Sequence, residues 1–299
     1  MLRTKIIVAA AVFSAFVAQP LGAPAPAQDA NGEQPGSLLG GPREEPIQQL
    51  ELQPGLLHTE YSSAAQAFAP RRLIYIVQSP DGEVLGKHGI SFTGLVVDGK
   101  PTILLEREYA FPFAGRSRLA VHWENLLPLE YQLELLSAAG ASGAEPQETW
   151  AVQYYYDLVA VSIKGGNYET FYSFRHPLKA YDLDELYLLF SMLAVGRLPA
   201  RSVVFVTAPF KHRNYAVLLE RLEREAIYAA DAERHVCVHL RLTFSDFTEE
   251  FYVEALPPHR VVKFTAGELG FTLLQDETGY EQAAEPRARQ TGSSPGGRF

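Results

Sequence analysis

The stretch HGISFTGLVVDGKPTILLEREYAF, residues 88–111, contains two apolar segments on either side of a short polar turn. Residues 88–97 and 101–111 are rich in the β-branched and aromatic side chains that favour strands. Asp98 and Gly99 between them tolerate the positive φ angles that a tight hairpin turn requires. The stretch therefore predicts two antiparallel strands joined by a tight turn.

Similar strand patterns follow one another through the middle of the chain, separated by Gly, Pro and Asp turns, which favours local antiparallel pairing. Within residues 150–163 the apolar parity changes near Asp157, and this predicts a bulge or bend in one long strand. We expect a mainly β fold, a strongly curled antiparallel sheet or open barrel, in which residues 57–276 form a single domain. Further predicted strands are residues 71–79, 117–124, 129–136 and 168–174.

The segment YDLDELYLLFSMLAVGRLP, residues 181–199, has the spacing of a helix. Asp182 and Glu185 stand three residues apart, as in a capping box, and Gly196 can end the helix. We expect one α-helix at about residues 183–194. Acidic residues belong in a first turn, so capping explains them without a metal ion. The apolar face consists of Leu183, Leu186, Phe190 and Leu193.

Residues 214–231, NYAVLLERLEREAIYAAD, present a conflict. Leu218 and Leu222 fall at helical spacing, and Glu220 and Arg224 form an i,i+4 pair. Periodicity alone predicts a helix for this segment.

From about Gly86 to Leu274 the chain resembles a family of exported bacterial domains of unknown function that form a curled antiparallel, loosely lipocalin-like β-sheet. The resemblance implies a strand for the segment that matches residues 214–229, and we follow it against the periodicity. It implies no catalytic residues. The motifs that carry it are LPLEYQLEL (127–135), YDLDELYLLFSML (181–193), RSVVFVTAP (201–209) and EEFYVEALPPHRVVKFTAGELGFTLL (249–274).

The first 27 residues have the order of a secretory signal peptide. Two cations, Arg3 and Lys5, precede an apolar run. This run is too short for a membrane-spanning helix, which needs about 20 residues. We expect cleavage after Ala27, a location in the periplasm or outside the cell, and no transmembrane segment after cleavage. Residues 28–56 and 277–299 are rich in Gly, Pro and polar residues and are expected to be disordered tails.

The charge and cysteine content exclude several classes of protein. The net charge is −9 and no basic stripe is present, which argues against binding to nucleic acid or to anionic lipid surfaces. The chain has one cysteine, so no intramolecular disulfide can form.

The sequence lacks the common catalytic motifs. It contains no G-x-S-x-G, no H-E-x-x-H, no phosphate-binding glycine loop with a lysine and no C-x-x-C. We therefore expect no catalytic residues, no cofactor and no enzymatic activity.

Aromatic residues offer a candidate binding site instead. Of the 15 tyrosines, Tyr154 and Tyr156 share one side of a predicted strand and could line a ligand cavity, because pockets are largely apolar and aromatic. The alternative is that they pack the face of a central strand, where aromatic residues are common.

The stretch HVCVHLRL, residues 235–242, raises the question of a metal site. His235 and His239 are about 13 Å apart along a strand, too far for both to reach one ion with bonds near 2 Å. A site would need partners such as His212 or His259, and nothing in the sequence places them there. We expect a plain two-faced strand and no metal. Its apolar face would be Val236, Val238, Leu240, Leu242 and Phe244, and its polar face His235, Cys237, His239 and Arg241.

Two functions fit these features better than a hydrolase, which ranks third. The first is an exported periplasmic binding or carrier module without enzymatic activity, which holds an apolar small molecule or an envelope component in the curl of its sheet. The alternative is an envelope-assembly or scaffolding factor that acts through protein contacts. A cavity lined by aromatic side chains would favour the first function.

Overall fold

The structure is a computed structural model, and its described part is built mainly of strands. The expected signal peptide, residues 1–27, lies outside the described residues, as do almost all residues of the two expected tails. The structure describes residues 48–49, 70–110, 114–136, 146–256 and 259–278.

The strands form one 16-stranded sheet with the spatial order β1-β11-β12-β13-β14-β15-β16-β2-β3-β4-β5-β6-β7-β8-β9, while β10 pairs with β11 beside this path. All neighbours are antiparallel except β1 and β10, which pair with β11 in parallel. The strands are β1 (Gln48–Gln49), β2 (Arg71–Gln78), β3 (Val84–Val97), β4 (Lys100–Tyr109), β5 (Gly115–His122), β6 (Pro128–Leu136), β7 (Pro146–Tyr154), β8 (Leu158–Gly165), β9 (Glu169–Arg175), β10 (Tyr181–Asp182), β11 (Arg201–Ala208), β12 (Arg213–Tyr228), β13 (Arg234–Thr243), β14 (Thr248–Glu254), β15 (Val261–Ala266) and β16 (Leu269–Thr278).

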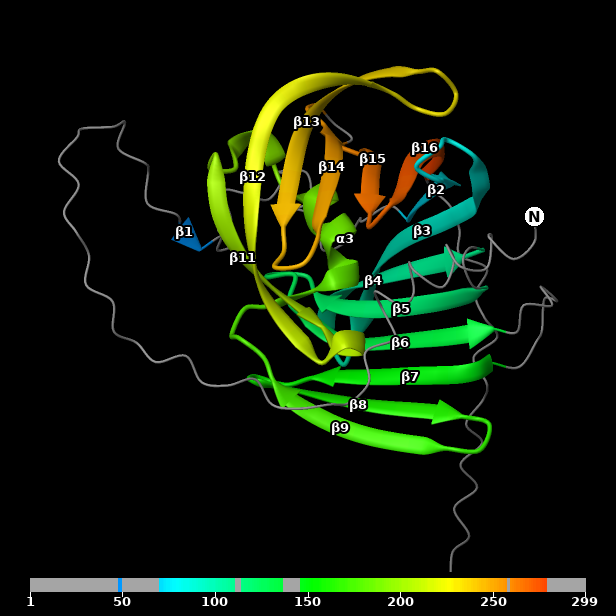
Figure 1. Cartoon of the computed structure of the whole chain (residues 1–299). Coiled ribbons are helices and arrows are strands. Elements are labelled where there is room, and N and C mark those ends of the chain that lie inside the picture. The colour runs from blue at the N-terminus through cyan, green and yellow to red at the C-terminus, as the bar shows by residue number, and fades with distance from the viewer. Residues whose placement is uncertain (1–47, 50–69, 111–113, 137–145, 257–258, 279–299) are drawn as a thin grey trace, which may run out of the picture.

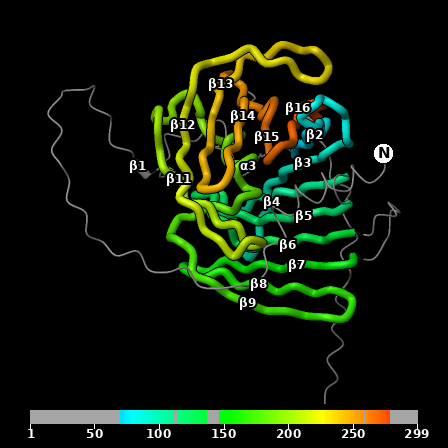
Figure 2. The backbone as a smooth tube through the Cα atoms, viewed as in Figure 1, coloured from blue at the N-terminus to red at the C-terminus, as the bar shows by residue number. Residues whose placement is uncertain are grey.

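The sheet curls strongly but does not close into a barrel. Strands β2–β9 form one arm and β11–β16 the other, and pairing of β16 with β2 joins the two arms. Figure 1 shows the arms at an angle to each other, with the short helix α3 between them. The tube in Figure 2 follows the same path. The curled antiparallel sheet expected from the sequence is therefore confirmed.

The hairpin expected at residues 88–111 forms. Val97 pairs with Lys100 across the turn, and the ladder continues to His88 and Tyr109. Asp98 has φ = 50° and Gly99 has φ = 76°, the left-handed region that Gly and Asp tolerate best. Local turn chemistry thus fixed the register of β3 and β4.

The expected helix is present but shorter. A 3₁₀ turn (η2, Leu183–Glu185) leads into α3 (Leu186–Met192), and the chain is already extended at Leu193. Gly196, expected to end the helix, lies in a later 3₁₀ turn (η3, Val195–Arg197). The capping box of Asp182 and Glu185 is confirmed. Among the described helices, none is long and apolar enough to cross a membrane.

Residues 213–228 form strand β12, as the family resemblance implied and against the helical periodicity. The outer half of β12 departs from regular pairing with β13, because the register shifts between Arg221 and Arg224. The misleading pattern arises before this bulge: Tyr215, Val217 and Leu219 are buried in the alternation of a strand, while Leu218 is an apolar residue on the other face.

The bend expected near Asp157 is instead a tight turn between two strands. β7 ends at Tyr154 and β8 begins at Leu158, and the Tyr155 N–H donates to the Leu158 carbonyl at 2.8 Å. The parity change that we read as a bulge is the reversal of the chain between two paired strands. No Gly or Pro marks this turn, which is why the pattern resembled one long strand.

Candidate functional site

The structure separates the two tyrosines that we proposed as ligand contacts. Tyr154 is buried at the end of β7, where its hydroxyl donates to Asp182. Tyr156 lies in the β7–β8 turn and is 82% exposed. The turn that replaces the expected long strand sends the two side chains to different places, so they do not line a common cavity.

A buried polar network surrounds the start of the helix, and Asp184 is its centre. Arg107 forms an ion pair with Asp184. The hydroxyls of Tyr109 and Tyr131 donate to the Asp184 Oδ2 atom at 3.2 and 2.9 Å. Arg107 also donates from Nε to the His88 Nε2 atom at 3.3 Å. We call these five residues the interior network.

Three further carboxyl groups lie buried around the interior network. Burial, together with the nearby Asp184 charge, raises the pKa of Asp182 to about 7. Burial also raises the pKa of Glu249 to about 8, although Arg107 opposes the shift. Burial raises the pKa of Glu185 as well. Buried carboxyls with raised pKa values favour the protonated form, so this region holds fewer negative charges near neutral pH than its sequence indicates.

The interior network joins the start of the helix to one arm of the sheet. Arg107 comes from β4 and Tyr131 from β6, while Asp184 lies in the 3₁₀ turn before α3. The buried Glu249 comes from β14 of the other arm. Perturbed carboxyls can mark a catalytic site, but structural ion-pair networks perturb pKa values too. One signal in the sequence points to the network: Ile103, Leu105 and Arg107 share one parity of β4, which turns Arg107 inward.

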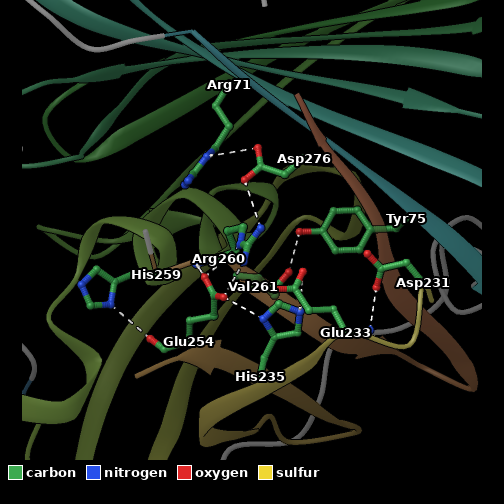
Figure 3. Close-up of polar contacts among 10 residues, drawn as sticks. All are labelled: Arg71, Tyr75, Asp231, Glu233, His235, Glu254, His259, Arg260, Val261 and Asp276. Atoms are coloured by element: carbon green, nitrogen blue, oxygen red, sulfur yellow. Dashed lines mark hydrogen bonds and ion pairs between the residues drawn. The ribbon is translucent and has the colours of Figure 1, made fainter. Parts of the chain in front are cut away.

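A second polar cluster lies at the other end of the molecule, where β2 and β13–β16 meet. Glu254 accepts hydrogen bonds from Arg260 Nη2 at 2.7 Å and from His235 Nδ1 at 2.8 Å. Arg260 also lies 3.5 Å from Asp276, and Asp276 lies 3.6 Å from Arg71. Figure 3 shows this chain of alternating charges, which we call the end cluster.

Charge pairing sets the protonation state of the end cluster. Burial on its own would raise the pKa of Glu254, but the hydrogen bonds from Arg260 outweigh it, and this pKa lies below its usual range. The carboxyl is therefore ionised and neutralised by Arg260. Tyr75 borders the cluster and donates to the Val261 carbonyl at 2.8 Å. The end cluster links neighbouring strands, and the Glu254 carboxylate is hydrogen-bonded within it.

The structure places the three candidate metal ligands of β13 with different partners. His235 contacts Glu254, whereas His239 contacts Glu225 through Nδ1 at 2.9 Å. Burial raises the pKa of the Cys237 thiol to about 12. Across the described ranges, no group of three or more His, Cys, Asp or Glu side chains could hold a metal ion. The absence of a metal stays a prediction that elemental analysis can test.

The two other candidate histidines lie apart from each other. The His212 ring centroid is 3.5 Å from that of Tyr172, near the β11–β12 turn. His259 lies beside the end cluster, where its Nδ1 is 3.1 Å from the Glu254 carbonyl oxygen.

The two expected faces of β13 are wrong at its first residues. Val236, placed on the apolar face, is half exposed, and Cys237, placed on the polar face, is buried. Val236 pairs with Ala226, which is exposed too, because β12 and β13 extend beyond the core there. On the other face, Glu254 is the strand partner of Cys237 and the end cluster covers it. From Val238 onward the expected apolar face is buried, as predicted.

An open depression of about 870 Å³ follows the bulge of β12. Three of the lining side chains form ion pairs: His239 with Glu225, and Arg241 with Glu250 at 3.3 Å. This lining suits a polar ligand better than an apolar one. The lining residues are Arg221, Leu222, Glu223, Arg224, Glu225, His239 and Arg241.

Comparison with known proteins finds similarity among solved structures. No family model matches the sequence, and no curated protein matches it. Among solved structures, a β-barrel-like protein of the domain of unknown function DUF1849 from Brucella abortus matches with a TM-score of 0.44 and 8% sequence identity. The match covers 71% of this chain and 98% of that chain. Like the family that the sequence resembles, this neighbour is a bacterial β-domain of unknown function.

Proposed function

We propose that this protein is an exported, non-enzymatic binding module that holds a protein partner on its outer surface. The observation that carries the proposal is the filled centre of the sheet. All seven residues of α3 are buried. The ring centroids of Phe190 and Phe251 are 5.0 Å apart, and those of Tyr187 and Phe264 are 4.5 Å apart. A drug-sized apolar ligand needs a cavity of several hundred Å³. Here the protein's own side chains occupy that position.

This reading favours the scaffolding alternative over the carrier of an apolar small molecule. Exposed aromatic side chains support it, because apolar groups on a surface mark contact sites when they gather together. Tyr168 in the β8–β9 turn and Phe171 on β9 are both exposed and lie close together in the chain. Tyr155 and Tyr156 are exposed in the β7–β8 turn, at the opposite end of β8. We assign the partner to the surface at β9.

The proposed export rests on the sequence. The proposed lack of catalysis rests on the contacts that the polar side chains already make. The leader pattern of residues 1–27 supports export to the periplasm, where an envelope protein is the expected partner. Both ring nitrogens of His239 face carboxylates, Nδ1 with Glu225 at 2.9 Å and Nε2 with Glu250 at 3.6 Å, and its ring stacks on Tyr252. These contacts support a structural role, because a general base needs a ring nitrogen that can reach its substrate.

The first experiment separates surface binding from a carrier role. The full chain is expressed with its leader, isolated from the periplasmic fraction and analysed by native mass spectrometry and solvent extraction. We expect the mass of the cleaved polypeptide and no stoichiometric lipid. A co-purifying apolar molecule at one per chain would overturn the surface proposal in favour of the carrier, and protein retained in the cytoplasm would overturn export.

The second experiment locates the partner surface. A photo-crosslinking amino acid replaces Phe171 on β9 in one variant and Tyr228 on β12 in the matched control, since both side chains are exposed on strands. We expect a discrete crosslinked protein species from position 171 and none from position 228. Equal crosslinking from both positions, or none from position 171, would contradict the assignment of this surface.

A further inference from the structure

We propose that β9 is a dimerisation strand: two copies of this protein pair their β9 strands antiparallel about a two-fold axis at Tyr172. The inference rests on the proposed function, because it names a second copy as the protein partner. Among the described strands, β9 is paired on one side only, by β8, whereas β11 is flanked by β1 and β10. An open strand edge is a template for another strand.

Hydrogen bonds at the two ends of the β8–β9 ladder identify the backbone groups that face outward. The Gly165 N–H donates to the Tyr168 carbonyl at 3.0 Å, and the His176 N–H donates to the Asp157 carbonyl at 3.1 Å. Alternate residues of an antiparallel strand bond to the same neighbour, so the even-numbered residues of β9 bond to β8. The backbone groups of the odd-numbered residues point away from the sheet: Glu169, Phe171, Ser173 and Arg175.

The sequence of β9, ETFYSFR, is complementary to itself when it is reversed about Tyr172. Glu169 then lies opposite Arg175 of the second copy, and Phe171 lies opposite Ser173. Both are pairs of odd-numbered residues, so the outward N–H and C=O groups of the two strands meet as hydrogen-bonded pairs. Opposite charges that face each other across two strands stabilise the pairing.

Other registers lose part of this complementarity. A slip by one residue sets odd-numbered residues against even-numbered ones, whose backbone groups are already bonded to β8. A slip by two residues in one direction sets Glu169 against Ser173, and in the other it moves Arg175 opposite Phe171. A parallel arrangement in register sets Glu169 against Glu169, and like charges in opposite positions destabilise a sheet. The antiparallel register about Tyr172 alone satisfies both the backbone and the charges.

The edge is also held ready for pairing. The Tyr172 hydroxyl donates to the Pro209 carbonyl at 3.0 Å, and the Asn214 side chain donates to the Arg175 carbonyl at 2.8 Å, which leaves that carbonyl its second lone pair. An ordered strand loses little conformational entropy when it binds. Phe171 is 68% exposed, and its diagonal neighbour across the axis is Phe171 of the second copy, within reach of an aromatic ring.

Sedimentation equilibrium of the full chain tests the dimer, and charge reversal tests its register. We expect the wild type to dimerise with rising concentration. Glu169→Arg alone and Arg175→Glu alone each create two like-charge pairs per dimer and should raise the dimer Kd about tenfold. The double variant restores opposite charges in this register and should return the Kd to within about twofold of the wild type.

A backbone variant provides a second measurement. Ser173→Pro removes an outward N–H that β8 does not use, and proline is tolerated on an edge strand in that position. We expect it to abolish the dimer with little change in melting temperature. A dimer that persists in Ser173→Pro, or whose Kd is unchanged by both charge reversals, would overturn the proposed interface.

The remaining outcomes separate this inference from the proposed function. A wild-type protein that stays monomeric, yet crosslinks from position 171 to a different protein, overturns the dimer and supports the proposed function. A dimer that responds to charge reversal as expected, but carries one apolar molecule per chain, supports the dimer and overturns the proposed function.

Discussion

Buried carboxyl groups lie both around the interior network and in the end cluster, yet their pKa values shift in opposite directions. In the end cluster, Arg260 binds Glu254 at close range and lowers its pKa. Around the interior network, burial dominates and raises the pKa of Glu249 to about 8, even though Arg107 opposes it. The comparison teaches that burial by itself does not decide whether a carboxyl is charged; the direct hydrogen bonds from a cation do.

The two regions should therefore limit stability at opposite ends of the pH range. Glu249 has a raised folded-state pKa, so its contribution is fully present below about pH 4.5 and is lost as the pH rises to about 8. Glu254 has a lowered pKa, so its contribution is present above pH 4.5 and is lost as the pH falls. We expect the protein to be most stable at mildly acidic pH.

The largest effect should come from breaking the interior network at its cation. Arg107→Leu leaves the Asp184 carboxylate without its ion pair inside the fold and should lower the free energy of unfolding by about 3–5 kcal/mol. The matched control is Arg116→Leu on the neighbouring strand β5, which removes a solvent-exposed pair with Glu134 and should cost at most about 1 kcal/mol. Urea unfolding measures both, and equal losses would show that the interior network is not special.

Neutralising the carboxyl of the end cluster should have a smaller effect. Glu254→Gln keeps the shape but weakens the charge-assisted hydrogen bonds from Arg260 and His235, at a cost of about 1.5–3 kcal/mol at pH 7. The control is Glu233→Gln, whose exposed carboxylate lies 3.7 Å from the other His235 nitrogen. A stability of Glu254→Gln equal to that of the control would contradict our account of this cluster.

The pH dependence gives the direct contrast between the two regions. Between pH 5 and 8 the unfolded state releases the Glu249 proton while the folded state keeps it, so wild-type stability should fall by up to about 1.4 kcal/mol per pH unit from this group. Glu249→Gln removes that contribution and should flatten the curve. The control Glu250→Gln, next on β14 but beside Arg241, should not flatten it. Urea unfolding at four pH values measures the slopes; parallel curves for Glu249→Gln and wild type would refute the prediction.

The features that could be predicted from the sequence are those made by residues close together in the chain. The hairpin at Asp98 and Gly99 and the cap at Asp182 and Glu185 follow from residues close in sequence, and both formed as expected. The strand β12 needed the family resemblance, because Leu218 on its outer face gives the segment a helical spacing. Local chemistry is visible in a sequence because turns and caps require particular side chains at fixed offsets.

The two polar regions could not be predicted, because each joins segments far apart in the chain. Arg107 and Asp184 are 77 residues apart, and the Arg71–Asp276 pair of the end cluster joins β2 to β16. Only the inward parity of Arg107 on β4 gave a hint of the first. The placement of Tyr154 and Tyr156 failed for a local reason, since a turn without Gly or Pro passed for continuous strand.

The smallest effect should be seen at Cys237, which borders the end cluster as the strand partner of Glu254. Burial raises the pKa of its thiol to about 12, and a protonated, buried thiol reacts slowly. At pH 8 we expect a thiol-specific reagent to label the folded wild type only as fast as the surrounding structure opens. Glu254→Gln should speed labelling because it loosens that cluster, whereas Glu249→Gln should not, because it lies in the other region.

Elemental analysis of the same dialysed samples should find no stoichiometric transition metal. A metal that is present in the wild type and lost in Cys237→Ala would show instead that β13 supplies a ligand, and slow labelling would then report metal binding rather than burial.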